Sequence, residues 1–373
     1  MGKRSGPAPD RDTVSTPLPI ACSGAASRLL SPNSGKAARC RCLSLHLVVW
    51  LALLFLPRQA HSADITPFYS QNLSPLVQIF GLPAAGAAAV LPAGKLSILL
   101  AADMASNNAM DATSRESILL DGESYRFTLA MRYGISGGFE GGVDIPYTGQ
   151  GGGIFDNFII GWHDFFNLPQ GGRKGEPRNR LLYNYTKDGE NRLLINDSDF
   201  GLGDIRLSGG MQLYHDGTEN PRDVALRASL KLPTGASSGL HGSGSTDFAL
   251  WLTASDDYRL PLGHFTLFGA AGGMGMSDGD ILPGQQKNLA GFGTFGFGWS
   301  PTKWIAFKVQ TSGHTPFFTG SDLRELSESA LQLIVGGTLA FSPQTSLDIG
   351  VSEDLAVNTT PDVALHLALH RLF

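Results

Sequence analysis

The feature that most constrains this chain is an alternation of apolar and polar residues with a period of two, which recurs along most of its length. In the segment 223–232, Leu226 and Leu230 fall on one face, whereas Arg227 and Lys231 fall on the other. Successive side chains of a β-strand point to opposite faces, so each such segment predicts a strand with one apolar and one polar face. About fourteen segments fit this template. They are 95–104, 123–134, 138–147, 180–186, 190–196, 203–214, 222–233, 246–256, 262–272, 288–299, 303–312, 328–341, 345–353 and 361–373.

The lengths of these segments and of their connections favour a membrane barrel. Many segments reach ten residues, whereas strands of globular proteins have ~5–6 residues and a tilted membrane-spanning strand needs ~9–11. Backwards from the C-terminus, long and short connections alternate, as do the external loops and periplasmic turns of outer-membrane barrels. We therefore predict an all-β fold, an antiparallel transmembrane (outer-membrane) β-barrel of about 12–14 strands in residues 95–373, with both ends periplasmic. The segment 180–196 decides the strand number.

The composition agrees with apolar residues that are dispersed rather than clustered. Hydrophobic residues make up 42% of the 373 residues and charged residues only 16%, whereas roughly 25% of a soluble domain is charged. The mean hydropathy of -0.01 is too low for a helical membrane protein, because such a protein needs apolar runs of ~20 residues.

Residues 1–62 differ from the rest and predict a basic leader with a secretory signal peptide. Basic residues precede the apolar run Leu43–Leu56, and small residues follow it. This run is shorter than the ~20 residues of a membrane anchor, so we expect cleavage between Ser62 and Ala63. Because the basic part is unusually long and no second Met precedes Met104, we expect translation to start downstream of the first Met.

The exported part, from residue 63 onward, lacks cysteine and has an acidic balance. All three Cys lie in the leader, so we expect neither a disulfide framework nor a thiolate metal site. The exported part has 20 basic and 31 acidic residues, a net charge of −11, which argues against nucleic acid as a partner. We expect no cofactor. Residues 63–94 precede the first predicted strand, and we expect them to form a periplasmic segment or to plug the lumen.

The last predicted strand, 361–373, ends on a large aromatic residue. Phe373 falls on the face predicted to contact lipid, and such a closing strand resembles the signal that the barrel-assembly machinery recognises. Arg371 falls on the same face, where an Arg at the membrane edge can reach the headgroups. We therefore expect the barrel-assembly machinery, periplasmic chaperones and outer-membrane lipids as partners, and the outer membrane as the location.

Charged residues on the polar faces of the strands are our candidates for the lining of the lumen. They carry both signs, whereas a strongly selective ion pore more often carries a ring of one sign. We therefore expect them to pair with one another and to pack the lumen as salt bridges. The candidates are Arg126, Arg132, Glu140, Asp144, Arg206, Arg227, Lys231 and Asp348.

The longest connection, roughly 148–202, is predicted to be a long external loop. If part of it forms a short helix that plugs the pore, Trp162, His163 and Asp164 would line a substrate path. The alternative, which we favour, is an external loop folded on its own apolar side chains.

Two further stretches suggest chemistry that their spacing does not support. The spaced side-chain oxygens of 196–204 hint at calcium, but the downstream Glu of an EF-hand loop is missing, so we expect a Gly-rich turn. The stretch 241–246 combines His with Ser but lacks the G-x-S-x-G elbow of a nucleophile. No catalytic triad can be assembled, so we expect no enzyme and keep an outer-membrane lipid-modifying hydrolase as an alternative.

Five stretches carry a resemblance to a known family: 71–83, 91–95, 119–147, 161–173 and 201–210. In this order they resemble a bacterial domain-of-unknown-function family, number 3187, regarded as outer-membrane barrels. A further segment, 230–247, resembles more weakly the phenol-degradation meta-pathway-associated barrel family, whose members are proposed uptake channels. The resemblance implies the barrel fold and brings no substrate, cofactor or catalytic residue.

Taken together, the sequence predicts an integral outer-membrane β-barrel protein that acts as a passive channel for the uptake of small molecules. The substrate is not specified. The alternatives are the lipid-modifying hydrolase and a structural or adhesive envelope protein, whose function would lie in the long external loop.

Overall fold

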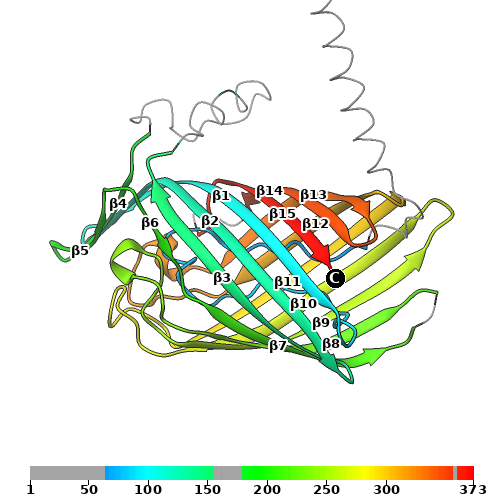
Figure 1. Ribbon diagram of the computed structural model, residues 1–373. Helices are drawn as coiled ribbons and strands as arrows, with labels where there is room; N and C mark the ends of the chain where they lie inside the picture. The colour runs from blue at the N-terminus through cyan, green and yellow to red at the C-terminus, as the bar shows by residue number, and fades with distance from the viewer. Residues whose placement is uncertain (1–63, 154–160, 162–178, 218, 356–358) are drawn as a thin grey trace, which may run out of the picture. The chain divides into compact units, whose positions relative to one another are not determined.

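Twelve antiparallel strands form a closed ring in the computed structural model, which describes residues 64–153, 161, 179–217, 219–355 and 359–373 (Figure 1). The ring closes where the first strand pairs with the last, from Ser97 opposite Leu372 to Ser106 opposite Val363. The predicted fold class is thereby confirmed. In the order of the ring the strands are β1 (Leu96–Ala112), β2 (Glu116–Ser136), β3 (Phe139–Gly151), β7 (Arg206–His215), β8 (Arg222–Lys231), β9 (Asp247–Arg259), β10 (His264–Met276), β11 (Leu289–Thr302), β12 (Ile305–His314), β13 (Ala330–Ser342), β14 (Thr345–Asp354) and β15 (Val363–Leu372).

Three shorter strands add to one end of the ring without entering it. The hairpin of β4 (Leu182–Lys187) and β5 (Glu190–Ile195) pairs with β2 beyond the part that faces β3. It projects from the barrel in Figure 1, so the predicted hairpin 180–196 exists but does not raise the strand number. The third, β6 (Asp199–Leu202), pairs with the outer part of β3, whose inner part pairs with β7. We call the end with β4 and β5 the outer end, and the end with Phe373 the inner end.

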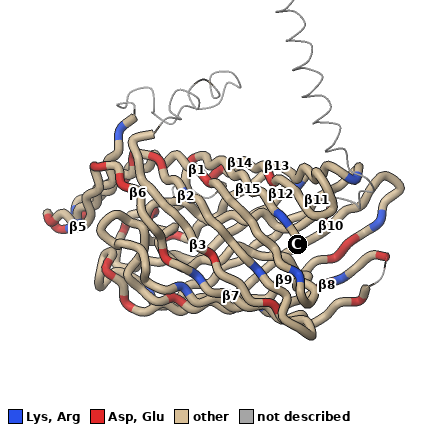
Figure 2. Tube along the Cα trace, in the orientation of Figure 1, with Lys and Arg blue, Asp and Glu red and all other residues tan. Residues whose placement is uncertain are grey.

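The wall turns its apolar side chains outward. Along β9, Phe248, Leu250 and Leu252 are 46–52% exposed, whereas the alternating Ala249 and Trp251 are buried. A soluble protein would bury such a row, so this reversal identifies the lipid-facing surface of a transmembrane barrel. Charged residues gather on the β4–β5 hairpin and on connections at both barrel ends (Figure 2). No helix among the described residues is long and apolar enough to cross a membrane.

Aromatic residues mark the inner rim of this surface. Trp299 and Trp304 flank the turn between β11 and β12 and remain exposed, and Trp299 stacks on Phe307 with ring centroids 6.2 Å apart. Such side chains favour the interface between hydrocarbon and headgroups. Phe373 is also exposed, beside the guanidinium of Arg371, and its N–H donates to the carbonyl of Leu96 at 2.7 Å.

Residues 64–95, which we call the plug hairpin, run through the inside of the ring. Phe68 contacts β12, where its N–H donates to Gln310, and the chain then turns over residues 73–80 near the outer end. It returns along β8 and β9 and leaves at the inner end, where Gly94 pairs with the backbone of Gly134. The blue trace within the strands in Figure 1 follows this path.

The turn of the plug hairpin packs into the largest apolar cluster of the described residues, at the outer end. Phe80 stacks on Phe317 with ring centroids 4.7 Å apart and meets Phe318 edge-on. Leu76 and Ile79 are also fully buried in the cluster. The other members come from the outer ends of strands, the β4 strand and the connections between strands, and include Ile118, Leu120, Tyr183, Tyr185, Leu240, Met274, Met276, Ile281, Leu282, Leu323 and Leu326. The outer half of the lumen is therefore filled.

Candidate functional site: the plugged lumen

The charged residues that the alternation assigns to the polar face lie inside the barrel. Six of them are buried: Arg126, Glu140, Asp144, Arg206, Arg227 and Lys231. The side chains of Arg132 and Asp348 are 21% and 16% exposed. Both contact a cavity in the lumen that is described below.

Several of these charges form ion pairs, between strands that are adjacent or one strand apart or with a connection. Arg227 binds Glu140 at 2.5 Å, and Arg132 binds Asp144, also at 2.5 Å. The ammonium group of Lys231 lies 2.6 Å from one carboxylate and 3.3 Å from another. Paired charges of this kind leave no ring of one sign in the described part of the lumen.

The wall cations also hold the plug hairpin, through its backbone rather than its side chains. Five of them donate to carbonyl oxygens of the hairpin at 2.5–3.3 Å. The pairs are Lys308 with Thr66, Arg126 with Gln78, Lys231 with Ile79, Arg206 with Leu82, and Arg227 with Ala87. Since a bond to a charged donor is stronger than a neutral one, these contacts are the main polar attachments of the hairpin.

Wall acceptors bind the backbone N–H groups of the same hairpin. Asp247 accepts from Gly81 at 2.6 Å, and Glu140 accepts from Leu91 at 2.8 Å. Most of the hairpin is not helix or strand, so its buried amides have no regular partner and must find one elsewhere. The polar inner face of the barrel supplies that partner.

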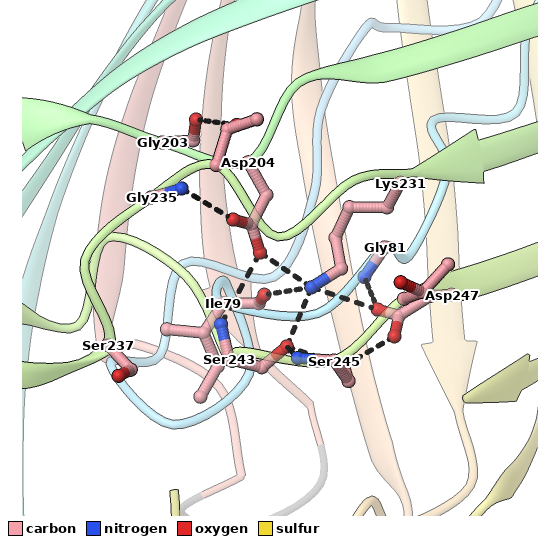
Figure 3. Close-up of polar contacts among 12 residues, drawn as sticks. Ile79, Gly81, Gly203, Asp204, Lys231, Gly235, Ser237, Ser243, Ser245 and Asp247 are labelled. Carbon is pink, nitrogen blue, oxygen red and sulfur yellow. Dashed lines mark hydrogen bonds and ion pairs between the residues drawn. The ribbon is translucent and has the colours of Figure 1, made fainter. Parts of the chain in front are cut away.

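Lys231 stands at the centre of the densest network (Figure 3). Its ammonium group contacts Asp204, Asp247 and Ser243, and donates to the carbonyl of Ile79 in the plug hairpin. Ser245 links Ser243 to Asp247 through its hydroxyl. One cation therefore links β8, β9, the plug hairpin and two connections at the outer end, those that contain Asp204 and Ser243.

A close approach of backbones explains one glycine of this network. A Cβ atom at Gly81 would lie 3.0 Å from the Cβ of Asp247 and 3.1 Å from that of Lys231. A Cβ atom here would make contacts tighter than most, so the plug hairpin or the wall would have to shift by a few tenths of an ångström at the point where Asp247 holds the N–H of Gly81. Gly81 thus favours the close docking of the plug, which sequence alone did not indicate.

A second anchor lies on the opposite side of the lumen. Lys308 is bound to Asp348 at 2.8 Å, and its ammonium group lies 4.1 Å from the ring centre of Phe68. The same ring meets His366 edge-on, and His366 binds Asp103 at 2.6 Å. Lys308 was missed among the predicted lining residues. The alternation of strand β12, where it stands between the exposed Phe307 and the half-buried Val309, could have identified it.

The stretch 241–246 folds into the wall and forms no catalytic relay in its hydrogen bonds. His241 bonds Thr148 at 3.1 Å and Asp199 at 3.0 Å, whereas Ser243 bonds Lys231 and Ser245. The hydrogen bonds of His241 therefore hold the connection between β8 and β9 against β3 and β6.

The oxygen-rich stretch 196–204 is used in the same way. Residues Asp199–Leu202 form β6, and Asp204 accepts hydrogen bonds from Lys231 and from the N–H of Gly235. Among the described residues, no group of three or more His, Cys, Asp and Glu side chains is placed to hold a metal ion.

A cavity of about 440 Å³ occupies the inner half of the lumen. Its walls are the two legs of the plug hairpin, the inner ends of β1, β13, β14 and β15, and the inward faces of β2, β3, β7, β8 and β9. It reaches the turn residues Pro343 and Gln344 at the inner end. The lumen is therefore hollow towards the inner end and filled towards the outer end.

Three predicted residues of the external loop, Trp162, His163 and Asp164, lie outside the described residues, as does the leader. Their predicted roles stay predictions.

Comparisons with known proteins give one family and several barrels. The family model described as "Protein of unknown function (DUF3187)" matches residues 43–373. The COG4313 outer membrane channel from Pseudomonas putida F1 is 12% identical over 76% of this chain and 97% of that chain, with a TM-score of 0.49. The NanC porin is 7% identical over 74% of this chain and 98% of that chain, with a TM-score of 0.37. The CymD monoaromatic hydrocarbon channel is 9% identical over 83% of this chain and 95% of that chain, with a TM-score of 0.33. Among the curated proteins, no sequence matches this chain.

Proposed function

The chain belongs to the DUF3187 family, and we propose that it is an outer-membrane channel for small molecules that its own N-terminal segment closes. The inner cavity is the vestibule of this channel, and the plug hairpin with the outer apolar cluster is its gate. Passage requires the hairpin to shift, since it fills the outer half of the lumen.

The observation that carries the proposal is that a segment of the chain, and not only side chains of the wall, fills the lumen. An eight-stranded barrel is filled by its own side chains, whereas a wider ring leaves space inside. Apart from the backbone bonds of Gly94 and Lys95 to Gly134 at its end, the segment in that space has no strand pairing to the wall and is attached largely by wall side chains that bind its backbone. Such a segment can move while every strand pair of the wall stays intact.

The test is a disulfide bond that links the plug hairpin to the wall and that a reductant can break. A Cβ atom at position 81 would lie 3.0 Å from the Cβ of Asp247, slightly closer than the ~3.5–4.5 Å of a disulfide. The exported chain has no cysteine, so Gly81→Cys/Asp247→Cys can form only this one bridge. Conductance of the purified variant is then recorded in planar bilayers, before and after a reductant is added.

We expect low conductance while the disulfide is closed and larger, fluctuating conductance after reduction. The single variant Gly81→Cys is the matched control, and its conductance should not respond to the reductant. A double variant that conducts equally in both states would contradict the role of the plug as a gate. A gel comparing boiled and unboiled samples shows that each variant is folded.

A further inference from the structure

The cavity has an excess of positive charge at its deep end. The guanidinium groups of Arg126, Arg132 and Arg206 all lie close enough to interact electrostatically with the carboxylate of Asp144 and the phenol of Tyr69. Only Arg132 forms an ion pair with this carboxylate, at 2.5 Å. In the part of the chain that the structure describes, neither Arg126 nor Arg206 has a carboxylate within ion-pair distance.

Two other carboxylates lie near the group, and both are engaged elsewhere. Glu140 interacts with Arg132 but forms its ion pair with Arg227 at 2.5 Å. Asp103 stands opposite Arg126 in the pairing of β1 with β2, but its carboxylate binds the ring of His366 at 2.6 Å. Even if Asp103 is counted in full and Glu140 is counted with its partner Arg227, four guanidinium groups face three carboxylates. The deep end therefore keeps at least one positive charge that the described residues do not balance.

Two of these guanidinium groups also have unused hydrogen-bond donors. The Nε atoms of Arg126 and Arg206 are buried without a hydrogen-bond partner, and the two residues are only 5% and 4% exposed. A buried charge with an unpaired donor is costly, so such a group is stable when an anion faces it. Arg206 lines the cavity, which places its charge within reach of a molecule inside.

The remainder of the cavity is apolar enough to hold the body of an organic molecule. The apolar lining comes from the plug hairpin and from the inner ends of strands, and includes Pro67, Pro83, Val90, Leu91, Leu99 and Leu372. The volume of about 440 Å³ falls within the ~300–1,000 Å³ of small-molecule sites. An anionic head and an apolar body are both accommodated.

We infer that the cavity binds a small organic carboxylate, with its carboxylate at Arg206 and its apolar body against the plug hairpin. Arg126, which is buried close enough to Arg206 to interact with it electrostatically, reinforces the positive potential. This inference deepens the proposed function, because it names the class of molecule that the channel admits. A planar guanidinium suits a carboxylate, to which it can donate two parallel hydrogen bonds.

The experiment measures binding by titration calorimetry on the folded, detergent-solubilised protein. The probe is hexanoate, and hexanamide is its neutral counterpart of nearly the same shape. We expect hexanoate to bind more tightly than hexanamide. Arg206→Gln should weaken hexanoate binding about tenfold or more, the equivalent of losing a charge-assisted hydrogen bond, and should leave hexanamide unchanged.

Two further variants separate charge at the site from charge in general. Arg206→Lys keeps the charge and should retain part of the preference for hexanoate. Lys303→Gln removes a positive charge from an exposed turn outside the plug and the cavity, and should bind hexanoate as the natural chain does. Equal binding of hexanoate and hexanamide, no binding of hexanoate, or an Arg206→Gln variant that binds hexanoate normally would overturn the inference.

This readout is independent of transport. If hexanoate fails to bind while reduction of the Gly81→Cys/Asp247→Cys disulfide opens the channel, the inference is wrong and the channel proposal stands. If hexanoate binds through Arg206 and the disulfide has no effect on conductance, the site is supported and the gate is not.

Discussion

Removal of the Lys231 ammonium group should destabilise both the barrel and the docking of its plug. The side chain is 3% exposed, and its ammonium group lies 2.6 Å from Asp204 and 3.3 Å from Asp247, whose own side chains are 4% and 1% exposed. Lys231→Met keeps the apolar stem and leaves two buried carboxylates facing each other. Breaking a buried ion pair by removing one partner costs about 3–5 kcal/mol.

The assay is urea unfolding of the protein refolded in lipid vesicles, with the free energy of unfolding as the readout. We expect Lys231→Met to lower it by about 3–5 kcal/mol. Lys303→Met is the matched control, because Lys303 is exposed at the turn between β11 and β12, and it should change the free energy by less than about 0.5 kcal/mol.

A triple variant tests whether the cost arises from unpaired charge. Lys231→Met combined with Asp204→Asn and Asp247→Asn removes all three charges, so it should recover part of the lost stability, because an uncharged network carries no buried unpaired ion. The reasoning is refuted if Lys231→Met unfolds like Lys303→Met, or if the triple variant is as unstable as the sum of its single substitutions.

Three further predictions follow from the packing. Gly81→Ala inserts a Cβ atom 3.0 Å from that of Asp247, so the plug hairpin should dock less tightly and be cleaved faster by an added protease; unchanged cleavage would contradict the close approach. Phe80→Ala removes the stack on Phe317 at 4.7 Å and should lower the free energy of urea unfolding by about 3–5 kcal/mol, a prediction that fails if the loss is below 1 kcal/mol. Phe373→Ala should lower the fraction of heat-modifiable protein in outer membranes while leaving the stability of refolded protein unchanged, and equal fractions would remove the assembly role.

The strands were predictable because lipid imposes a two-sided pattern on them. Where the wall crosses the membrane, as at Leu250 and Trp251, the outward residue is apolar and exposed and the inward one is buried. The outer part of β2, residues 116–122, was not predicted as strand, since it extends past the membrane and pairs with the β4 strand. There the lipid no longer selects one apolar face.

The plug hairpin was harder to predict, since most of its polar attachments to the wall use its backbone rather than its side chains. The hairpin binds Lys231 and Arg227 through carbonyl oxygens and binds Asp247 through an N–H group. Every residue except Pro offers both groups, so no sequence pattern of the hairpin indicates these contacts. The wall did contain a relevant pattern, because inward charges of both signs can bind the backbone of a segment in the lumen. From the sequence, however, we expected these charges only to form salt bridges with one another.

The measurement that tests the central claim most directly is hydrogen–deuterium exchange of the plug hairpin in the folded, membrane-reconstituted protein. The account predicts slow exchange for the amides of Phe68, Gly81, Val90 and Leu91, because wall side chains hold them in a segment without strand pairing. Exchange at the rate of an unstructured peptide across residues 64–92 would contradict it.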